Sequence, residues 1–272
     1  MQLFSSWTGS DFLLFYIMML GLSGFAAWWI PAHLREPGRR GESDDFESIA
    51  VLAGGRWRMA DSLLADLYVR GALVPAEKGK LAVVEPDLPA SPGGTALLAI
   101  GAPVSLKEAR KAILAHSERV VARLRRAGLL LRPEEHARLR ILSIMPFAAL
   151  FMIGLYRQRA GSAVDEPTGF LVALLVLTIV LAIIRYAKSD PRTAAGVAAV
   201  QDFRARNGRF ARAPRPDEVA MAVALFGTGV LVGTPWEPVH ALRQQSGDGG
   251  GADGNSDSDG SGCGGGCGGC GG

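Results

Sequence analysis

The segment FLLFYIMMLGLSGFAAWWIPA, residues 12–32, contains no charged side chain. A helix of about twenty residues is long enough to cross a hydrocarbon core about 30 Å thick. Trp28 and Trp29 lie near its end, where aromatic rings favour the membrane interface, and a run of arginines begins at Arg35. Because Lys and Arg gather on the cytoplasmic side of a membrane, residues 1–34 are predicted to form a first transmembrane helix with its N-terminus outside.

A cleavable signal peptide is the alternative for this segment. Such a peptide carries basic residues before its apolar run and a small-residue cleavage site after it. Here the residues before Phe12 include no Lys or Arg, and no A-x-A site follows Ala32. The segment is therefore expected to remain in the protein as a membrane anchor.

Two further apolar runs cover residues 141–156 and 170–184. The first is short for a span and has arginines on both sides, whereas the second is almost pure Leu, Val and Ile. A helix pair joined by a turn-rich loop satisfies the backbone of both runs in lipid and returns the chain to the side it left. Residues 141–187 are therefore predicted to be a transmembrane helix pair, with Arg157 and Arg159 at its outer end.

A fourth apolar run, residues 219–234, follows a basic segment at residues 188–218 that is expected in the cytoplasm. The run is short and rich in Gly and Ala. We predict a fourth span over residues 219–236, with an interfacial or re-entrant helix as the alternative. A fourth span would return the chain to the outside, so the C-terminal tail is expected to be extracytoplasmic.

Residues 35–140 have the pattern of a small soluble domain, expected in the cytoplasm because the basic flanks of three apolar runs converge on it. Apolar residues at helical spacing are interrupted by Gly54-Gly55, and a hairpin pattern follows them. Ser105 and Glu108 form a capping-box pattern at the start of an arginine-rich helix that ends at Gly128. We predict two small helical modules in tandem, in a winged-helix-like α+β arrangement.

The fold class expected from these features is mainly α. It is a multi-span α-helical membrane protein with a small winged-helix-like cytoplasmic domain and a disordered C-terminal tail. The composition agrees, because 49% hydrophobic residues and a mean hydropathy of +0.20 exceed what an ordinary soluble surface carries. The formal net charge is only +3, so the placement of the charges rather than their total indicates the topology.

Residues 246–272 contain almost only Gly, Ser, Asp and Asn, apart from the three cysteines Cys263, Cys267 and Cys270. Without large hydrophobic residues this tail cannot offset the entropy lost on ordering, so it is predicted to be disordered. The C-x-x-x-C-x-x-C spacing could hold a soft metal, because thiolates bind Zn, Cu(I) and iron–sulfur clusters. The alternative is that these thiols are incidental, oxidised or modified. No cofactor is assigned.

No catalytic constellation is recognisable in the sequence. The four histidines are scattered, and each is expected to be a surface or interface residue: His33, His116, His136 and His240. No nucleophile-elbow, zincin, phosphate-loop or dinucleotide-binding motif occurs in its proper context. The apolar runs also lack the charged residues on which transporters depend. The chain is therefore predicted not to be an enzyme, and no small-molecule substrate is identified.

Four short motifs occur along the chain in addition to the Gly/Cys tract at its end. They are Phe12-Leu-Leu-Phe-Tyr16, Leu52-Ala-Gly-Gly55, Arg70-Gly-Ala-Leu73 and Pro167-Thr-Gly-Phe-Leu171. With these motifs the chain resembles an uncharacterised family of bacterial membrane proteins that has such a core and a Cys/Gly-rich C-terminus. The resemblance implies a bacterial membrane location and no particular chemistry.

These observations predict a non-enzymatic, multi-pass protein of the bacterial inner membrane. Its partners are expected to be the lipid bilayer and an unidentified protein, contacted through the cytoplasmic domain. The arginine-rich helix that begins after Ser105 is expected to face solvent and anionic headgroups. One alternative is a membrane-anchored regulator that binds DNA through the winged-helix-like modules, although nucleic acid is the less favoured partner. Another is a membrane protein that binds a soft metal through the cysteine tail.

Overall fold

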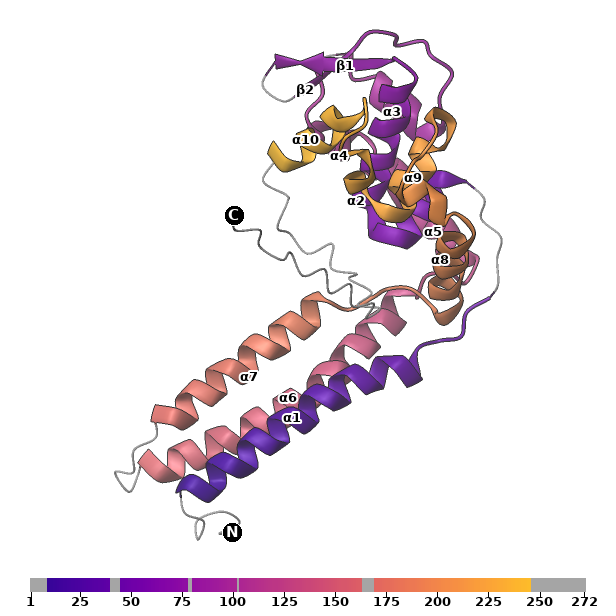
Figure 1. Cartoon of the computed structure of the whole chain (residues 1–272). Coiled ribbons are helices and arrows are strands. Elements are labelled where there is room, and N and C mark those ends of the chain that lie inside the picture. Colours follow the sequence, from indigo (N-terminus) through magenta and orange to yellow (C-terminus); the bar gives the residue numbers. More distant parts are fainter. Residues whose placement is uncertain (1–8, 40–44, 78–79, 102, 163–168, 246–272) are drawn as a thin grey trace, which may run out of the picture.

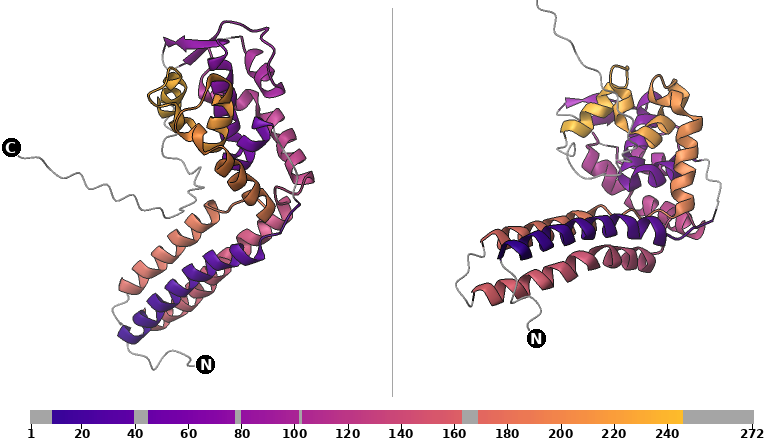
Figure 2. Two further views of the ribbon diagram at one scale, coloured as in Figure 1. Left: turned by 45° about the vertical axis from the view of Figure 1, so that its right-hand side comes forward. Right: turned by 60° about the horizontal axis from the view of Figure 1, so that its bottom comes forward.

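The computed structural model describes residues 9–39, 45–77, 80–101, 103–162 and 169–245. Helices dominate this part of the chain, and three of them are long and apolar enough to cross a membrane. These three lie together as a bundle, while the shorter helices gather into a domain at one end of it (Figures 1 and 2).

The helices and strands follow one another in a simple order. The helices are α1 (Gly9–Leu34), α2 (Phe46–Val69), α3 (Pro92–Leu98), α4 (Leu106–Ala112), α5 (Leu114–Arg126), α6 (Pro133–Ser162), α7 (Gly169–Ala187), α8 (Ala194–Arg206), α9 (Val219–Phe226) and α10 (Glu237–Gln245). The strands β1 (Leu73–Ala76) and β2 (Lys80–Val83) pair as an antiparallel hairpin. Short 3₁₀ helices occupy Gly208–Ala211, Pro216–Glu218 and Thr228–Leu231.

The bundle consists of α1, α6 and α7, and α6 packs against both of the others. Its buried core is small: Phe12, Tyr16, Leu150, Leu171 and Leu175. The hydroxyl oxygens of Tyr16 and Thr178 lie 3.0 Å apart, and Gly154 allows the Tyr16 ring to approach α6 closely. At most 22% of each apolar stretch is buried by protein, so most of the bundle surface is left for lipid.

The second span is much longer than the apolar run that indicates it. We expected a helix over residues 141–156, whereas α6 has 30 residues. Pro133 suits the first turn of a helix, Glu134 and Glu135 favour its N-terminal dipole, and the Arg132 amide donates to the Glu135 carboxylate at 2.9 Å. The apolar run therefore marks only the part of the helix that lipid can cover, and the charged residues extend it on both sides.

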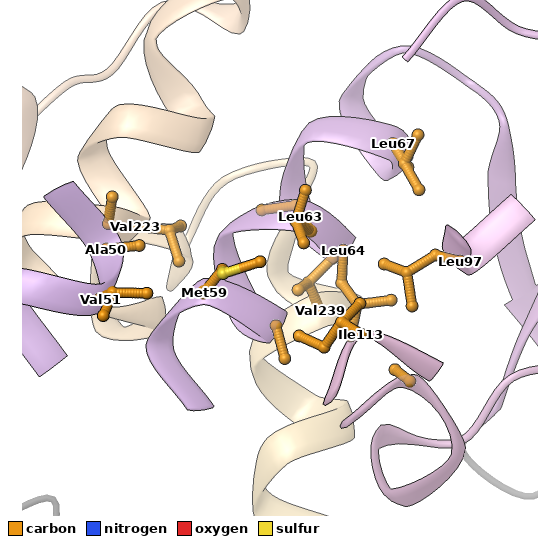
Figure 3. Packing of buried hydrophobic residues seen from close by; sticks show 14 of the residues in the cluster. Ala50, Val51, Met59, Leu63, Leu64, Leu67, Leu97, Ile113, Val223 and Val239 are labelled. Atoms are coloured by element: carbon orange, nitrogen blue, oxygen red, sulfur yellow. The ribbon is translucent and has the colours of Figure 1, made fainter. Parts of the chain in front are cut away.

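The domain has one continuous hydrophobic core, which differs from the two separate modules expected for residues 35–140. Helices α2 to α5, α8, α9 and α10 and the hairpin all contribute to it. Met59, Leu63 and Leu64 of α2 are fully buried at its centre, with Val223 of α9 and Val239 of α10 close by (Figure 3). Segments separated by more than 100 residues thus complete one fold.

Two local predictions for the domain are confirmed. Gly54 and Gly55 interrupt α2 with non-helical backbone, and Gly55 has a φ of +75°, which favours glycine. The Ser105 hydroxyl accepts from the Glu108 amide at 3.3 Å, and the Glu108 carboxylate accepts from the Ser105 amide at 2.8 Å, which is the expected capping box. The helix that follows is broken at Ile113, so it forms α4 and α5 rather than one long helix.

Residues 219–236 do not form the fourth span that we expected. Helix α9 has eight residues and is therefore about 12 Å long, too short to cross a membrane. Most of its side chains are buried in the domain core against α2. A helix that is apolar on all sides suits a protein interior as well as lipid, and only tertiary packing distinguishes the two. The extracytoplasmic location expected for residues 246–272 depended on this span, so it no longer follows.

The chain passes between bundle and domain three times, and the three passages bind one another. We call residues 36–39, 128–131 and 191–196 the junction. Its backbone hydrogen bonds are Ala194 to Glu36 (2.9 Å), Ala195 to Pro37 (2.9 Å), Arg39 to Gly128 (3.3 Å), Thr193 to Leu129 (3.1 Å) and Leu131 to Pro191 (2.8 Å). The buried Thr193 hydroxyl also donates to the carbonyl of Gly128 at 2.8 Å. The junction therefore holds the domain against the end of the bundle.

Glycines make this close approach possible. A Cβ atom on Gly38 would lie 2.4 Å from the Gly128 carbonyl oxygen, and one on Gly196 would lie 2.2 Å from the Leu129 carbonyl oxygen. Both distances are far below van der Waals contact with a backbone atom. The junction cannot accept a larger residue at either position without moving apart.

Substitution Gly196→Ala should destabilise the protein by about 1–3 kcal/mol, because the methyl group must displace the Leu129 backbone. Gly208→Ala is the matched control, since nothing lies within 4 Å of the position of its Cβ. Thermal unfolding in detergent, followed by tryptophan fluorescence, should show a fall of several degrees for the first variant only. Equal unfolding temperatures for the two variants would contradict a tight junction.

Candidate functional site

A pocket lies where the domain-facing end of the bundle meets the start of α8. Its cavity volume is about 640 Å³, and α1, α6, α7, the α7–α8 connection and α8 all contribute to its wall. We call it the interface pocket. The residues that give it its chemical character are Trp28, Arg35, His136, Arg185, Lys188, Ser189, Asp190 and Arg192.

Four cationic side chains and one carboxylate line the interface pocket. Asp190 accepts from the Arg35 guanidinium at 3.1 Å and from Nε of Arg192 at 3.0 Å. The Arg192 side chain is only 5% exposed, so this pair belongs to the wall of the pocket. Arg185 is half-buried and donates from Nε to the Ala27 carbonyl at 2.9 Å, while Lys188 is exposed. One carboxylate cannot balance four cations, so the pocket has a net positive charge.

Asp190 remains ionised despite its burial. Burial alone would raise the pKa of this carboxyl group. Hydrogen bonds from the Arg192 side chain and backbone, with the charges of Arg192 and Arg35, outweigh burial and bring the pKa below its usual value. The carboxylate therefore fixes the positions of two arginines at neutral pH.

A second polar group extends the site along α6. The Ser189 hydroxyl lies 2.8 Å from Nε2 of His136 and accepts from Nε of Arg140 at 2.6 Å. The Arg140 guanidinium also lies over the ring of Tyr186, 4.7 Å from its centroid. These contacts orient Arg140 beside the interface pocket at the end of the bundle.

The chemistry of this arrangement suits a phosphate group. Guanidinium groups offer several N–H donors in a fork that matches phosphate oxygens, and an ammonium group adds a point charge. Basic pockets between membrane helices bind anionic lipid headgroups in the same way. Trp28 belongs to the amphipathic residues that favour the membrane interface, and it lines the same pocket.

Most of the residues singled out in the sequence do not line the interface pocket. Cys263, Cys267 and Cys270 lie outside the described residues, so soft-metal binding by the tail stays a prediction. Within the described part of the chain, no group of three His, Cys, Asp or Glu side chains could hold a metal ion. His33 is exposed and stacks on Trp29, with the ring centroids 4.1 Å apart. His136 lines the interface pocket.

His116 is buried, which the sequence did not predict. Its Nε2 lies 2.6 Å from the Glu47 carboxylate, which also accepts from the Gly93 amide at 3.1 Å. The contact joins α2, α3 and α5 inside the domain. His240, by contrast, is half-buried, with Nδ1 3.0 Å from the Thr228 hydroxyl. Both side chains of the Glu47–His116 pair are buried, so we assign the pair to the stability of the domain.

Sequence reasoning missed the interface pocket as a unit, because its cations come from position 35 and from positions 185–192. One signal was present: Asp190 is a single carboxylate within the basic stretch that ends the third apolar run. No family model, curated protein or solved structure compared with this chain matches it. The function must therefore be inferred from the site.

Replacing Asp190 by Asn should destabilise the protein by about 1–3 kcal/mol at neutral pH, because Arg35 and Arg192 lose their shared charged acceptor. The lowered pKa means that the carboxylate stabilises the fold above its unfolded pKa of about 3.8 and that this contribution is lost as the pH falls through the folded value. The difference in unfolding temperature between wild type and variant should thus be large at pH 7 and shrink below about pH 4. If the difference in unfolding temperature stayed constant from pH 7 to pH 3, the charge of Asp190 would contribute nothing to the stability of the fold.

Proposed function

We propose that this chain is a non-enzymatic protein of the bacterial inner membrane whose interface pocket binds the phosphate of an anionic headgroup. The observation that supports this most is the convergence of Arg35, Arg185, Lys188 and Arg192 on one pocket at the end of the bundle. By this reading the bound headgroup helps to hold the helical domain at the membrane surface. The resemblance to uncharacterised bacterial membrane proteins agrees with this location.

The distribution of basic residues supports a cytoplasmic domain and an outside N-terminus. Arg35, Arg138, Arg140 and the stretch from Arg185 to Arg192 lie at the domain-facing end, whereas Arg157 and Arg159 lie near the other end. This asymmetry follows the positive-inside pattern. With three spans instead of four, residue 245 lies on the same side as the domain, so we place the Gly/Cys-rich tail in the cytoplasm as well.

DNA binding by the domain is the second candidate. Arg119 and Arg125 of α5 are exposed, and the hairpin of β1 and β2 follows α2, which is the order that suggested a winged-helix arrangement. Other arginines of the same region have partners within the domain: Arg123 donates to Asp45 at 2.9 Å, and Arg110 lies over the Trp57 ring. The basic side chains of the interface pocket, in contrast, converge on one cavity, which favours the headgroup.

For the topology, Ala115→Cys on the exposed side of α5, in a variant without the tail cysteines, should not react with an impermeant maleimide in intact cells. It should react after lysis. Ser10→Cys at the opposite end of α1 should react in intact cells. The reverse pattern would contradict a cytoplasmic domain, and equal labelling of both positions before lysis would contradict a spanning bundle.

For the headgroup, the protein in a zwitterionic detergent should be stabilised against heat by dihexanoyl phosphatidylglycerol more than by dihexanoyl phosphatidylcholine. The double substitution Arg185→Gln with Lys188→Gln should weaken binding of the anionic lipid about tenfold or more, since each cation near anionic headgroups contributes about 1 kcal/mol. Arg119→Gln with Arg212→Gln, both exposed and outside the pocket, is the matched control.

Equal stabilisation by both lipids, or equal weakening in the control, would contradict the proposed site. The DNA candidate can be tested with the same preparation in phosphatidylcholine nanodiscs. Retardation of labelled duplex DNA with a steep loss on adding salt, together with no preference for phosphatidylglycerol, would favour the regulator.

A further inference from the structure

An apolar groove lies between α6 and α7, in the half of the bundle that is nearer the domain. Its cavity volume is about 410 Å³. Its wall includes Phe147, Ala148 and Phe151 of α6 and Ala182, Ile183 and Tyr186 of α7. The lining is almost wholly apolar, which suits hydrocarbon.

A cation lies at the domain-facing end of this groove. Arg140 is one helical turn before Ile144, which also lines the groove, and its guanidinium lies over the Tyr186 ring. The same guanidinium donates to Ser189, which lines the interface pocket. A guanidinium has five N–H donors, so these contacts leave donors for a phosphate. Arg140 therefore connects the apolar groove with the interface pocket.

We propose that the groove and the interface pocket bind one phospholipid together, with an acyl chain along the groove and the phosphate at Arg140 and Ser189. This rests on the proposed function, because it assumes that the pocket binds an anionic headgroup. It goes further in naming the ligand as an acylated lipid rather than a phosphate compound from solution.

Charge and position favour this occupant over a second copy of the chain or another membrane helix. The groove opens on a bundle surface that protein leaves largely uncovered, and Arg140 at its end donates to Ser189, which lines the interface pocket. A phospholipid has an acyl chain next to its phosphate, and the protein has an apolar groove next to a positively charged pocket. The two arrangements match. A helix packed into the groove would supply apolar surface without a charge for Arg140.

The experiment compares dioctanoyl phosphatidylglycerol with glycerophosphoglycerol, its deacylated form, in binding to the full chain in detergent, measured by native mass spectrometry. Ala148→Phe fills the groove, and Ala182→Phe fills it from the opposite wall. Ala149→Phe is the matched control, because Ala149 is exposed on the neighbouring position of α6 and does not line the groove.

The acylated lipid should bind the wild type more tightly than the deacylated form. Each groove-filling variant should weaken the acylated lipid at least about tenfold, since displacing two methylene groups has about that effect. Binding of the deacylated form should not change, and Ala149→Phe should behave as wild type. If both filling variants misfold, lengthening the chains from butanoyl to octanoyl in the wild type gives the same information, and the affinity should rise with each step.

Three outcomes would overturn this proposal. Equal affinity for the acylated and deacylated forms, with no effect of chain length, would leave a headgroup site without an acyl-chain site. Loss of self-association in Ala148→Phe, with unchanged lipid affinity, would assign the groove to a second copy. Binding of neither form would instead reject the proposed function on which this inference rests.

Discussion

The whole architecture depends on the junction, where three separate passages of the chain hydrogen-bond to one another between the bundle and the domain. Backbone groups that leave a membrane helix must find partners, because an unsatisfied buried amide or carbonyl is costly. Here the Ala194 amide donates to the Glu36 carbonyl. The Arg39 amide and the Thr193 hydroxyl both donate to the Gly128 carbonyl. Glycine at positions 38 and 196 is the condition for this contact, since side chains there would collide with backbone oxygens.

The junction also places the charges that form the interface pocket. Arg35 follows α1, and Asp190 and Arg192 follow α7, so fixing these passages together brings one carboxylate between two arginines. The remaining cations then face a cavity that the bundle and α8 enclose. A bound phosphate would contact residues from several membrane helices at once. The proposed headgroup site and the attachment of the domain to the bundle thus share the passage that follows α7, which contains Arg192 of the pocket and Thr193 of the junction.

Features that depend on local sequence were predicted well, and those that depend on distant contacts were not. The apolar runs at 12–32 and 170–184 identify α1 and α7, and the Ser105–Glu108 spacing identifies the start of α4. The apolar run at residues 219–234 predicts a span over residues 219–236, and only the contact of α9 with α2 places this segment in the domain. The Glu47–His116 pair joins residues 69 positions apart, so no local sequence pattern predicts it.

The proposed function depends on an anionic phospholipid bound at the end of the bundle. The most direct measurement is native mass spectrometry of the chain released from its own membrane, with the bound lipids identified. The account predicts that anionic phospholipid stays bound at collision energies that remove zwitterionic lipid, in excess of its share of the bulk membrane. Adducts that merely reproduce the bulk lipid composition and dissociate together would contradict it.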